Sequence, residues 1–450
     1  MFDREFDNAL KAWKNSKSRK PLVLRGARQV GKSTVVRRFG KTYSQFMEFN
    51  LDQASERRLF DSDLSSKEMV SALFFEKGAR MNHPDTLLFI DEIQNSDRAT
   101  ALLRYFKEEF PEYHVIAAGS MLEHYINDEK ASFPVGRVEY RFMRPLSFFE
   151  FLGAIGENHA CEELKKVPLA PYAHAKLSIL FARYAMTGGM PEVVANWAER
   201  QDMSVVRDNL QALLTSYGDD ARKYAHSREF GLLLQRVISM APLEAGKRIV
   251  FEKFGNSNIR SREMGDALRT LERALLLELI YPTTAWEAPL VANQRKRPRL
   301  QFLDTGLMNH ACNTTVHLLR GADISGVAEG RIAEHMVGQE LEALNSTTPR
   351  SLCFWVRESN QSNAEIDYIF VHDGRPIPVE VKAGASGSLR SLHQFVDSSS
   401  CRLAVRFWSG PPQIETQKTP AGSYYKLANL PHYLAGSLPS YLDWIKETLV

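Results

Sequence analysis

The stretch GARQVGKST, residues 26–34, decides the fold of the first third of the chain. Gly26–Ser33 fits the pattern G-x-x-x-x-G-K-[ST] in full, between an apolar run at Leu22–Leu24 and a helical stretch at Thr34–Phe39. Glycines let backbone N–H groups curl around an anion, and the N-terminus of the next helix adds the positive end of its dipole. The sequence therefore predicts a phosphate-binding loop between a buried strand and a helix.

Two side chains of this loop have expected tasks, which make ATP and Mg²⁺ the expected cofactors. Lys32 places a positive charge on the outer phosphates, and the hydroxyl of Ser33 is a ligand for Mg²⁺. The alternative is a Gly-rich turn without a ligand, and both flanking elements argue against it. The residues predicted to hold the nucleotide are Gly26, Ala27, Arg28, Gln29, Val30, Gly31, Lys32, Ser33 and Thr34.

A second motif follows in LLFIDE, an apolar strand that ends in Asp91 and Glu92. A carboxylate near Lys32 and Ser33 would hold the Mg²⁺ shell, which is the role expected of Asp91. Glu92 would orient or deprotonate the attacking water, because phosphoryl transfer depends mainly on positioning and charge. We therefore predict Lys32, Asp91 and Glu92 as the catalytic residues. Two solvated acids at a strand end are the alternative.

Further candidates for the nucleotide site come from the next strand and from three arginines. The strand Val115–Ala118 is followed by Gly119-Ser120, and the Ser120 side chain is a candidate sensor of the γ-phosphate or a simple turn residue. Arg137 is a candidate arginine finger for a neighbouring subunit, or a surface arginine. Arg141 and Arg144 compete for the same role.

Composition limits the class of protein. The chain has 450 residues, 44% of them hydrophobic and 25% charged, which predicts a globular protein of two to four domains. Its net charge of +3 means that any nucleic-acid surface must be local. No stretch is long and apolar enough to predict a membrane helix. The cysteines Cys161, Cys312, Cys353 and Cys401 are far apart and predict free thiols, so a cytoplasmic location is expected.

Short apolar runs alternate with charged helical stretches over residues 21–150, which predicts a parallel α/β sheet. The segments GARQVGKST, LLFIDEIQ, AAGSM, GRVEYRFMRPLSFFEFL and TGGMPEVV together resemble the AAA-type ATPases of bacteria and archaea related to the archaeal ATPase and STAND groups. The resemblance implies an ATP-binding core, Mg²⁺, a possible homo-oligomer and a C-terminal domain of poorly defined function.

The middle of the chain is mostly helical. Residues 259–276 have apolar side chains near helical spacing and lead into a strand-like run, LLELIYPTT, which is how a winged helix-turn-helix would read. Arginines would give this helix a basic side, or would simply be solvated. The basic run Arg295–Arg299 could contact phosphates or form a solvated loop. The helix arginines are Arg260, Arg262, Arg269 and Arg273.

Carboxylates recur near the C-terminus. Asp367 lies in one expected strand, and Glu380 and Lys382 share one face of the next. Asp373-Gly374 between the strands indicates a hairpin, so that Asp367 and Glu380 can converge on one Mg²⁺. Lys382 would then position water or stabilise charge.

The pattern D-x₁₂-E-x-K and the helix before it resemble the PD-(D/E)XK nuclease fold. This resemblance implies a metal site of Glu334, Asp367 and Glu380 with Lys382, and it gives Gln394 a position that is glutamine in some nucleases of the fold. A nuclease fold without activity, or a strand-face salt bridge to Lys382, is the alternative.

We therefore expect an α/β protein with four parts. They are a P-loop ATPase core (1–155), a helical lid (156–225), a winged-helix-like segment (226–300) and a nuclease-like domain (301–450). The expected function is Mg²⁺-dependent ATP hydrolysis coupled to nucleic acid, with DNA, including branched DNA, as the expected partner. The alternatives are a nucleotide-switched interaction or signalling protein with an inactive nuclease-like binding domain, and an ATPase for a protein substrate.

Overall fold

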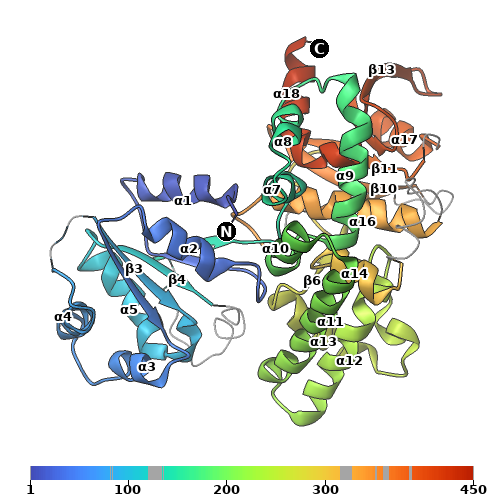
Figure 1. Cartoon of the computed structure of the whole chain (residues 1–450). Helices are drawn as coiled ribbons and strands as arrows, with labels where there is room; N and C mark the ends of the chain where they lie inside the picture. The colour runs from blue at the N-terminus through green and yellow to red at the C-terminus, as the bar shows by residue number, and fades with distance from the viewer. Residues whose placement is uncertain are drawn as a thin grey trace. The chain divides into compact units, whose positions relative to one another are not determined.

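The computed structural model places the chain in two compact units (Figure 1). The N-terminal unit comprises residues 1–144, 273–275 and 346–349, and the C-terminal unit comprises the rest. No helix among the described residues is both long and apolar enough to cross a membrane. The residues that the structure describes are 2–81, 83, 85–119, 134, 136–314, 327–349, 352–357, 364–384 and 388–448.

The N-terminal unit is a five-stranded parallel sheet with α-helices around it (Figure 1). Its strands are β1 (Leu22–Arg25), β2 (Gln45–Asn50), β3 (Thr86–Asp91), β4 (His114–Ala118) and β5 (Glu139–Phe142). Its helices are α1 (Phe6–Lys14), α2 (Lys32–Gly40), α3 (Ala54–Phe60), α4 (Ser66–Glu76) and α5 (Asp97–Glu108), with a 3₁₀ turn at Ile93–Asn95.

The strand order β2-β3-β4-β1-β5 confirms the predicted parallel sheet. Strand β4 lies between β1 and β3, with Leu24 opposite Ala118 and Ile90 opposite Ala117. The carboxyl ends of β1, β3 and β4 therefore meet at one edge of the sheet. Strand β5 was not expected, because its EYRF sequence is short and half-polar. It completes the other side of β1.

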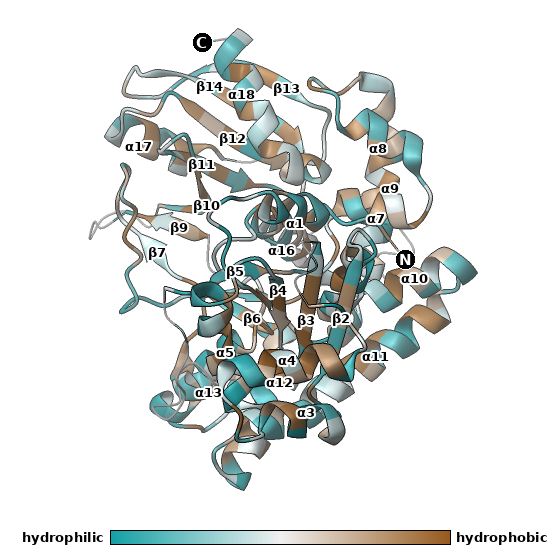
Figure 2. Cartoon of the chain, turned by 90° about the vertical axis from the view of Figure 1, so that its left-hand side faces the viewer, coloured by the Kyte–Doolittle hydropathy of each residue, from teal (hydrophilic) through white to brown (hydrophobic). Residues whose placement is uncertain are grey.

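The sheet is buried on both faces. Alternate strand residues such as Val23, Leu88 and Val115 form one apolar cluster with side chains of α4 and α5, including Phe106. The intervening residues, such as Phe89, are also fully buried. This double burial explains the apolar runs of the three central strands β1, β3 and β4, and β3 is largely brown in Figure 2.

The C-terminal unit starts with helices and ends in a large sheet. Its α-helices are α7 (Phe148–Ala154), α8 (Asn158–Leu164), α9 (His174–Thr187), α10 (Pro191–Arg200), α11 (Met203–Asp220), α12 (Arg228–Glu244), α13 (Ser261–Arg273), α14 (Thr305–Ala311), α16 (Val327–Ala343), α17 (Arg390–Ser398) and α18 (Leu438–Thr448). Its 3₁₀ turns are Pro171–Ala173, Ala221–Tyr224, Phe251–Asn256 and His432–Ser437.

The large sheet has seven strands in the order β13-β14-β12-β11-β10-β9-β7. Helix α17 crosses from β11 to the parallel strand β12, and its side chains cover one face of the sheet. The strands are β7 (Pro282–Thr283), β9 (Cys353–Val356), β10 (Glu365–His372), β11 (Arg375–Val381), β12 (Leu403–Trp408), β13 (Gln413–Lys418) and β14 (Tyr424–Pro431).

The predicted hairpin between β10 and β11 is confirmed. Asp373 and Gly374 have φ values of 49° and 73°, the left-handed conformation that a tight two-residue turn requires. A register shift between Ile366 and Ile369 marks a β-bulge in β10. The bulge contains Asp367, and bulges commonly re-aim a side chain next to a site.

A separate antiparallel pair, β6 (Leu277–Ile280) and β8 (Arg299–Phe302), follows α13. Arg248, between α12 and α13, adds an isolated antiparallel bridge to Arg299. The segment between β6 and β8 contains β7, which pairs in parallel with β9 at the edge of the large sheet. The β6–β8 segment (residues 277–302) therefore contributes to both sheets.

The segment TGGMPEVV has a packing role in the C-terminal unit. Gly189 N donates to the buried Asp304 carboxylate at 2.6 Å, and Gly189 O accepts from Leu146 N at 2.7 Å. A Cβ atom at Gly189 would lie 2.2 Å from Leu146 O. The glycine is therefore required by a close approach between backbones.

We expect Gly189→Ala to destabilise the protein by about 2–3 kcal/mol, because the added methyl group overpacks a buried contact. Thermal unfolding followed by circular dichroism measures the effect. Gly153→Ala on α7 is the matched control, since its Cβ meets nothing within 4 Å. Equal melting temperatures for the two variants would contradict the packing role.

Candidate active site

The loop between β1 and α2 has the backbone that its glycines predict. Gly31 has a φ of 94° and precedes the first residue of α2, and Gln29 is also left-handed at 65°. A Cβ atom at Gly26 would lie 2.5 Å from the carbonyl oxygen of Met143. The loop therefore fits closely against the chain that follows β5, and its last turn opens into the N-terminus of α2.

Lys32 lies inside this loop. Its Nζ donates to the carbonyl oxygens of Gly26 and Ala27, both at 2.9 Å, and the side chain is buried. Burial lowers the pKa of Lys32 to about 8, and the nearby carboxylates of Glu92 and Asp91 oppose this shift. A buried ammonium group that bonds to neutral carbonyls is well placed to bind the phosphates of a nucleotide.

Ser33 and Asp91 come together across the sheet, as the sequence predicted. The Ser33 hydroxyl is close enough to the Asp91 carboxylate to act against the rise of its pKa, and this carboxylate accepts a hydrogen bond from the backbone N–H of Glu92 at 3.1 Å. Asp91 is buried, and the loss of solvation raises its pKa despite these interactions.

The neighbouring oxygens of Ser33 and Asp91 fit Mg²⁺, which prefers hard oxygen ligands and is usually held by one or two carboxylates with substrate phosphates. The raised pKa of Asp91 supports this fit, because a cation beside a desolvated carboxylate would favour its charged form.

Glu92 has an unusual backbone. Its φ of 51° and ψ of 44° are left-handed, which costs free energy in a residue other than glycine and is common at functional sites. Gln94 Nε2 donates to Glu92 Oε2 at 2.5 Å. The half-buried Glu92 side chain thus directly follows Asp91 at the carboxyl edge of β3 and is held by its neighbour.

Arg4 is a site residue that the sequence analysis missed. Its buried side chain donates to Val30 O in the loop at 3.2 Å and to Arg144 O at 2.7 Å. It therefore ties the phosphate-binding loop to the segment after β5. No motif surrounds Arg4, so the sequence contains no signal for this role.

The other candidates near the nucleotide are placed as follows. Ser120 lies outside the described residues. Arg137 forms an ion pair with Glu108 at 2.7 Å. Arg141 donates to Tyr140 O and Arg144 donates to Pro349 O, both at 2.8 Å. The arginine finger remains a prediction.

A second group of buried charged residues lies in the C-terminal unit. It contains the predicted Glu334 on α16, Asp367 in the β10 bulge and Glu380 on β11, together with Arg299 at the start of β8. Arg299 donates to both Glu334 and Asp367, and Lys382 forms an ion pair with Glu380. We call Arg299, Glu334, Glu365, Asp367, Glu380 and Lys382 the carboxylate cluster.

Most carboxylate oxygens of the cluster already have donors. Asp367 Oδ1 accepts from Arg299 at 3.1 Å, and Oδ2 accepts from Val381 N at 2.8 Å. Burial raises the pKa of both Glu334 and Glu380, opposed by Arg299 and Lys382 respectively. Glu380 Oε2 is buried and has no hydrogen-bond partner among the described residues.

A metal ion does not fit the cluster in this arrangement, because it would need oxygens that now bind Arg299 and Lys382. Within the described part of the chain, one group of three side chains has ligand atoms within 4.8 Å of one another. That group is His372, Asp373 and Asp443, outside the cluster, where Lys446 already pairs with Asp373 at 2.9 Å. Gln394, the remaining predicted residue, lies on α17.

The exposed side of α13 carries both charges. Arg262 is exposed beside Glu263, and Arg269 pairs with Asp266 at 2.9 Å. The predicted basic side of this helix is therefore partly neutralised. The basic run differs, since Arg295, Lys296 and Arg297 are all exposed, whereas Arg299 is turned into the carboxylate cluster.

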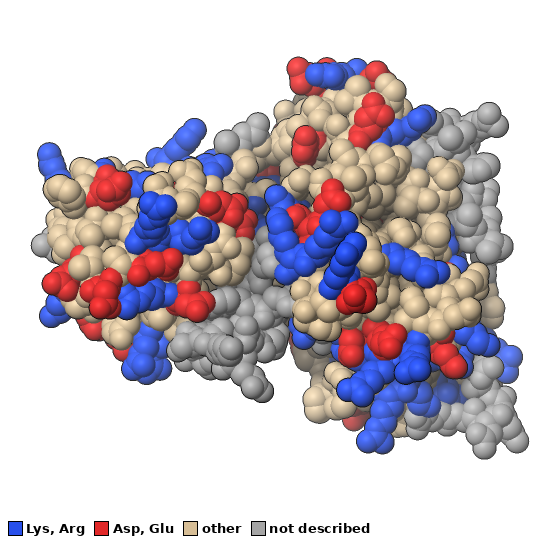
Figure 3. Space-filling view, turned by 90° about the horizontal axis from the view of Figure 1, so that it is seen from below, with Lys and Arg blue, Asp and Glu red and all other residues tan. Residues whose placement is uncertain are grey.

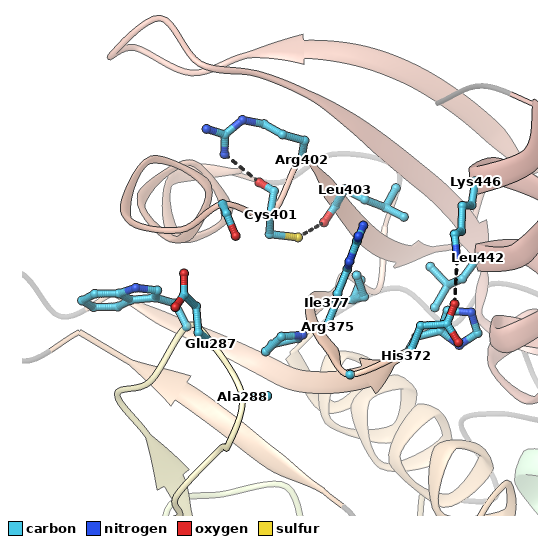
Figure 4. A pocket seen from close by; sticks show the side chains of 15 residues that line it. Glu287, Ala288, His372, Arg375, Ile377, Cys401, Arg402, Leu403, Leu442 and Lys446 are labelled. Carbon is cyan, nitrogen blue, oxygen red and sulfur yellow. Dashed lines mark hydrogen bonds and ion pairs between the residues drawn. The ribbon is translucent and has the colours of Figure 1, made fainter.

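A pocket of about 580 Å³ lies beside the β6–β8 segment (Figure 4). Its lining includes the half-exposed ring of Trp286, apolar side chains such as Ile377 and Leu442, and the cations Arg375, Arg402 and Lys446. Arg402 donates to the carbonyl oxygen of Cys401, and Lys446 pairs with Asp373. Glu287 and Asp373 also line the pocket, so its charges are mixed.

Family comparisons agree with the N-terminal site. Residues 18–152 match a family model described as an AAA domain. Residues 179–317 and 329–409 match two models described as domains of unknown function, DUF8612 and DUF4143. A comparison with curated proteins gave no match.

Two solved structures are similar to the chain at low identity. The Walker-type ATPase PABY2304 of Pyrococcus abyssi is 14% identical over 69% of this chain and 96% of its own, with a TM-score of 0.44. PCH-2 of C. elegans is 11% identical over 45% of this chain and 65% of its own, with a TM-score of 0.27. Neither similarity carries an argument. The AAA-domain match over residues 18–152 and the loop around Lys32 agree with each other, and together they support a P-loop ATPase domain of the AAA type in the N-terminal region.

Proposed function

We propose that the chain is a Mg²⁺-dependent ATPase that acts on DNA through its C-terminal unit. The observation that carries the ATPase part is the convergence of Lys32, Ser33 and Asp91 at one edge of the parallel sheet. In parallel α/β sheets this carboxyl edge is where ligands bind.

The residues of the site divide the work of hydrolysis. Lys32 and the backbone N–H groups of the loop bind and orient the outer phosphates, and their positive charge stabilises the transition state. Ser33 and Asp91 would hold Mg²⁺, which would neutralise phosphate charge. Glu92 orients the attacking water and accepts its proton at a side-chain carboxylate oxygen.

The DNA part of the proposal is supported by the order of elements around the β6–β8 segment. Helix α12, the bridge at Arg248, helix α13 and the β6–β8 pair follow one another as in a winged helix. The segment also has Trp286 half-exposed and the run Arg295–Arg297 exposed. Cations for phosphates and an aromatic ring for bases are the two ingredients of single-strand binding.

A second candidate is a nucleotide-switched interaction protein, in which the C-terminal unit binds a protein partner and cuts nothing. The mixed charge of α13 and the neutralised carboxylate cluster favour it. Figure 3 also shows Lys and Arg side chains interspersed with Asp and Glu on one face of the molecule. The PD-(D/E)XK resemblance of the β10–β11 region is compatible with either candidate, because a nuclease fold can serve as a binding module.

Lys32→Ala is expected to lower ATP turnover at least a hundredfold, because it removes the charge that contacts the outer phosphates. A phosphate-release assay with Mg²⁺ measures the loss. The control is Lys41→Ala, an exposed lysine just after α2. Near-normal turnover by Lys32→Ala would exclude this loop as the active site.

Glu92→Gln is expected to bind ATP as tightly as the wild type and to hydrolyse it at least a hundredfold more slowly, because the amide cannot accept the proton of water. Nucleotide binding by fluorescence and turnover by phosphate release separate the two effects. An equal loss of binding and turnover would assign Glu92 to nucleotide binding instead.

Single-stranded, duplex or branched DNA is expected to stimulate ATP turnover and to bind with a strong salt dependence. Replacement of Arg295, Lys296 and Arg297 by alanine should lower the slope of log affinity against log salt by about 2–3, since each phosphate contact contributes just under one. DNA binding by fluorescence anisotropy at several salt concentrations measures this slope.

The control for this test removes the same charge from exposed lysines of the N-terminal unit, Lys17, Lys41 and Lys67. An equal change of slope in both triple variants would show that only net charge matters. Turnover that no form of DNA affects would favour the interaction protein over the DNA-dependent ATPase.

A further inference from the structure

Arg299 uses its whole guanidinium group on the carboxylate cluster. Nε donates to Glu365 at 2.9 Å, Nη1 donates to Glu334 and Asp367, and Nη2 donates to Glu365 and Asp367. The five N–H donors of an arginine side chain are thus all directed at carboxylates, in the planar fork geometry that arginine offers.

The guanidinium group is enclosed by the protein, because only 12% of the Arg299 side chain is exposed. Its guanidinium carbon lies 5.0 Å from the centroid of the Phe354 ring, which adds a cation–π contact. The main chain of Arg299 is fixed as well, because it pairs with Ile280 in β6 and bridges to Arg248. Arg248 reinforces the cluster through an ion pair with Glu365 at 3.2 Å.

The cluster contains the residues that the PD-(D/E)XK resemblance assigns to a metal ion, and Arg299 bonds to two of them. We propose that the Arg299 guanidinium group permanently takes the place of the divalent cation in the carboxylate cluster. The carboxylate cluster then needs no metal ion. Its role is to join the β6–β8 segment to the large sheet, and it does not catalyse phosphodiester cleavage.

The charges support this assignment. The carboxylates of Glu334, Glu365, Asp367 and Glu380 repel one another in this largely buried space, and cations beside them lower that cost. Arg299, Lys382 and Arg248 supply three positive charges without an ion from solution. Arginine is suited to this task, because its charge does not titrate in proteins and its fork binds carboxylates at two points. The inference holds whether the partner is DNA or protein.

The test is manganese binding to the full chain without nucleotide, followed by electron paramagnetic resonance. The wild type is expected to hold no Mn²⁺ in the carboxylate cluster, so the wild type and Asp367→Asn should bind the same number of Mn²⁺ ions. Arg299→Met keeps similar bulk but frees the carboxylates, so it should gain about one Mn²⁺ per chain, which Arg299→Met/Asp367→Asn should lose. Ion bound at the ATP site or at His372 is distinguished because it does not depend on Asp367.

Two results would overturn the proposal. One is a stoichiometric Mn²⁺ ion in the wild type that Asp367→Asn releases. The other is an Arg299→Met variant that keeps the wild-type circular dichroism spectrum and a cooperative thermal transition of the C-terminal unit, and so is folded, but gains no ion. Should Arg299→Met fail to fold, the wild-type measurement still decides the question.

Melting temperatures give an independent reading. Arg299→Met should lower the melting temperature by roughly 10 °C, because it leaves buried carboxylates uncompensated, and Mn²⁺ should restore part of the loss. EDTA should not change the melting temperature of the wild type. A large drop with EDTA, reversed by Mg²⁺ and absent in Asp367→Asn, would contradict the proposal.

Discussion

The ATP site depends on one constraint, the parallel pairing of β1, β4 and β3. Because β4 pairs in parallel with both β1 and β3, the carboxyl ends of all three strands lie at the same edge of the sheet. Only there can Ser33, in the first turn of α2, lie beside Asp91, the last residue of β3. Burial of these three strands on both faces fixes their register, because a shift of one residue along a strand would move each apolar side chain to the opposite face of the sheet and out of its packing site.

The acidic residues of the ATP site and those of the carboxylate cluster are compensated in different ways. At the ATP site, Asp91 has the Ser33 hydroxyl and Lys32 nearby, and no arginine of the described residues forms an ion pair with it, so a cation from solution can still be added. In the carboxylate cluster, the side chains of Arg299 and Lys382 form the ion pairs that a metal ion would otherwise make. The two sites have similar acidic motifs in the sequence, and only the contacts of their side chains in the structure distinguish them.

Local patterns predicted much of the fold. The phosphate-binding loop, the strand before Asp91 and the Asp373-Gly374 hairpin depend on backbone conformation and short-range periodicity, which a sequence displays directly. Strand β5 and the roles of Arg4 and Arg299 were not found. Each depends on a partner far away in the chain, such as Arg144 for Arg4, and neither arginine lies in a motif that names its partner.

The β6–β8 segment has a consequence for how the C-terminal unit is built. It gives β7 to the edge of the large sheet and Arg299 to the carboxylate cluster. A fragment that began after it would leave β9 as a bare edge strand, open to pairing with other chains, beside acidic groups without their counter-charge. The helical and sheet regions, although matched by separate family models, therefore share a strand and a buried ion-pair network, and we expect neither to fold stably without the other.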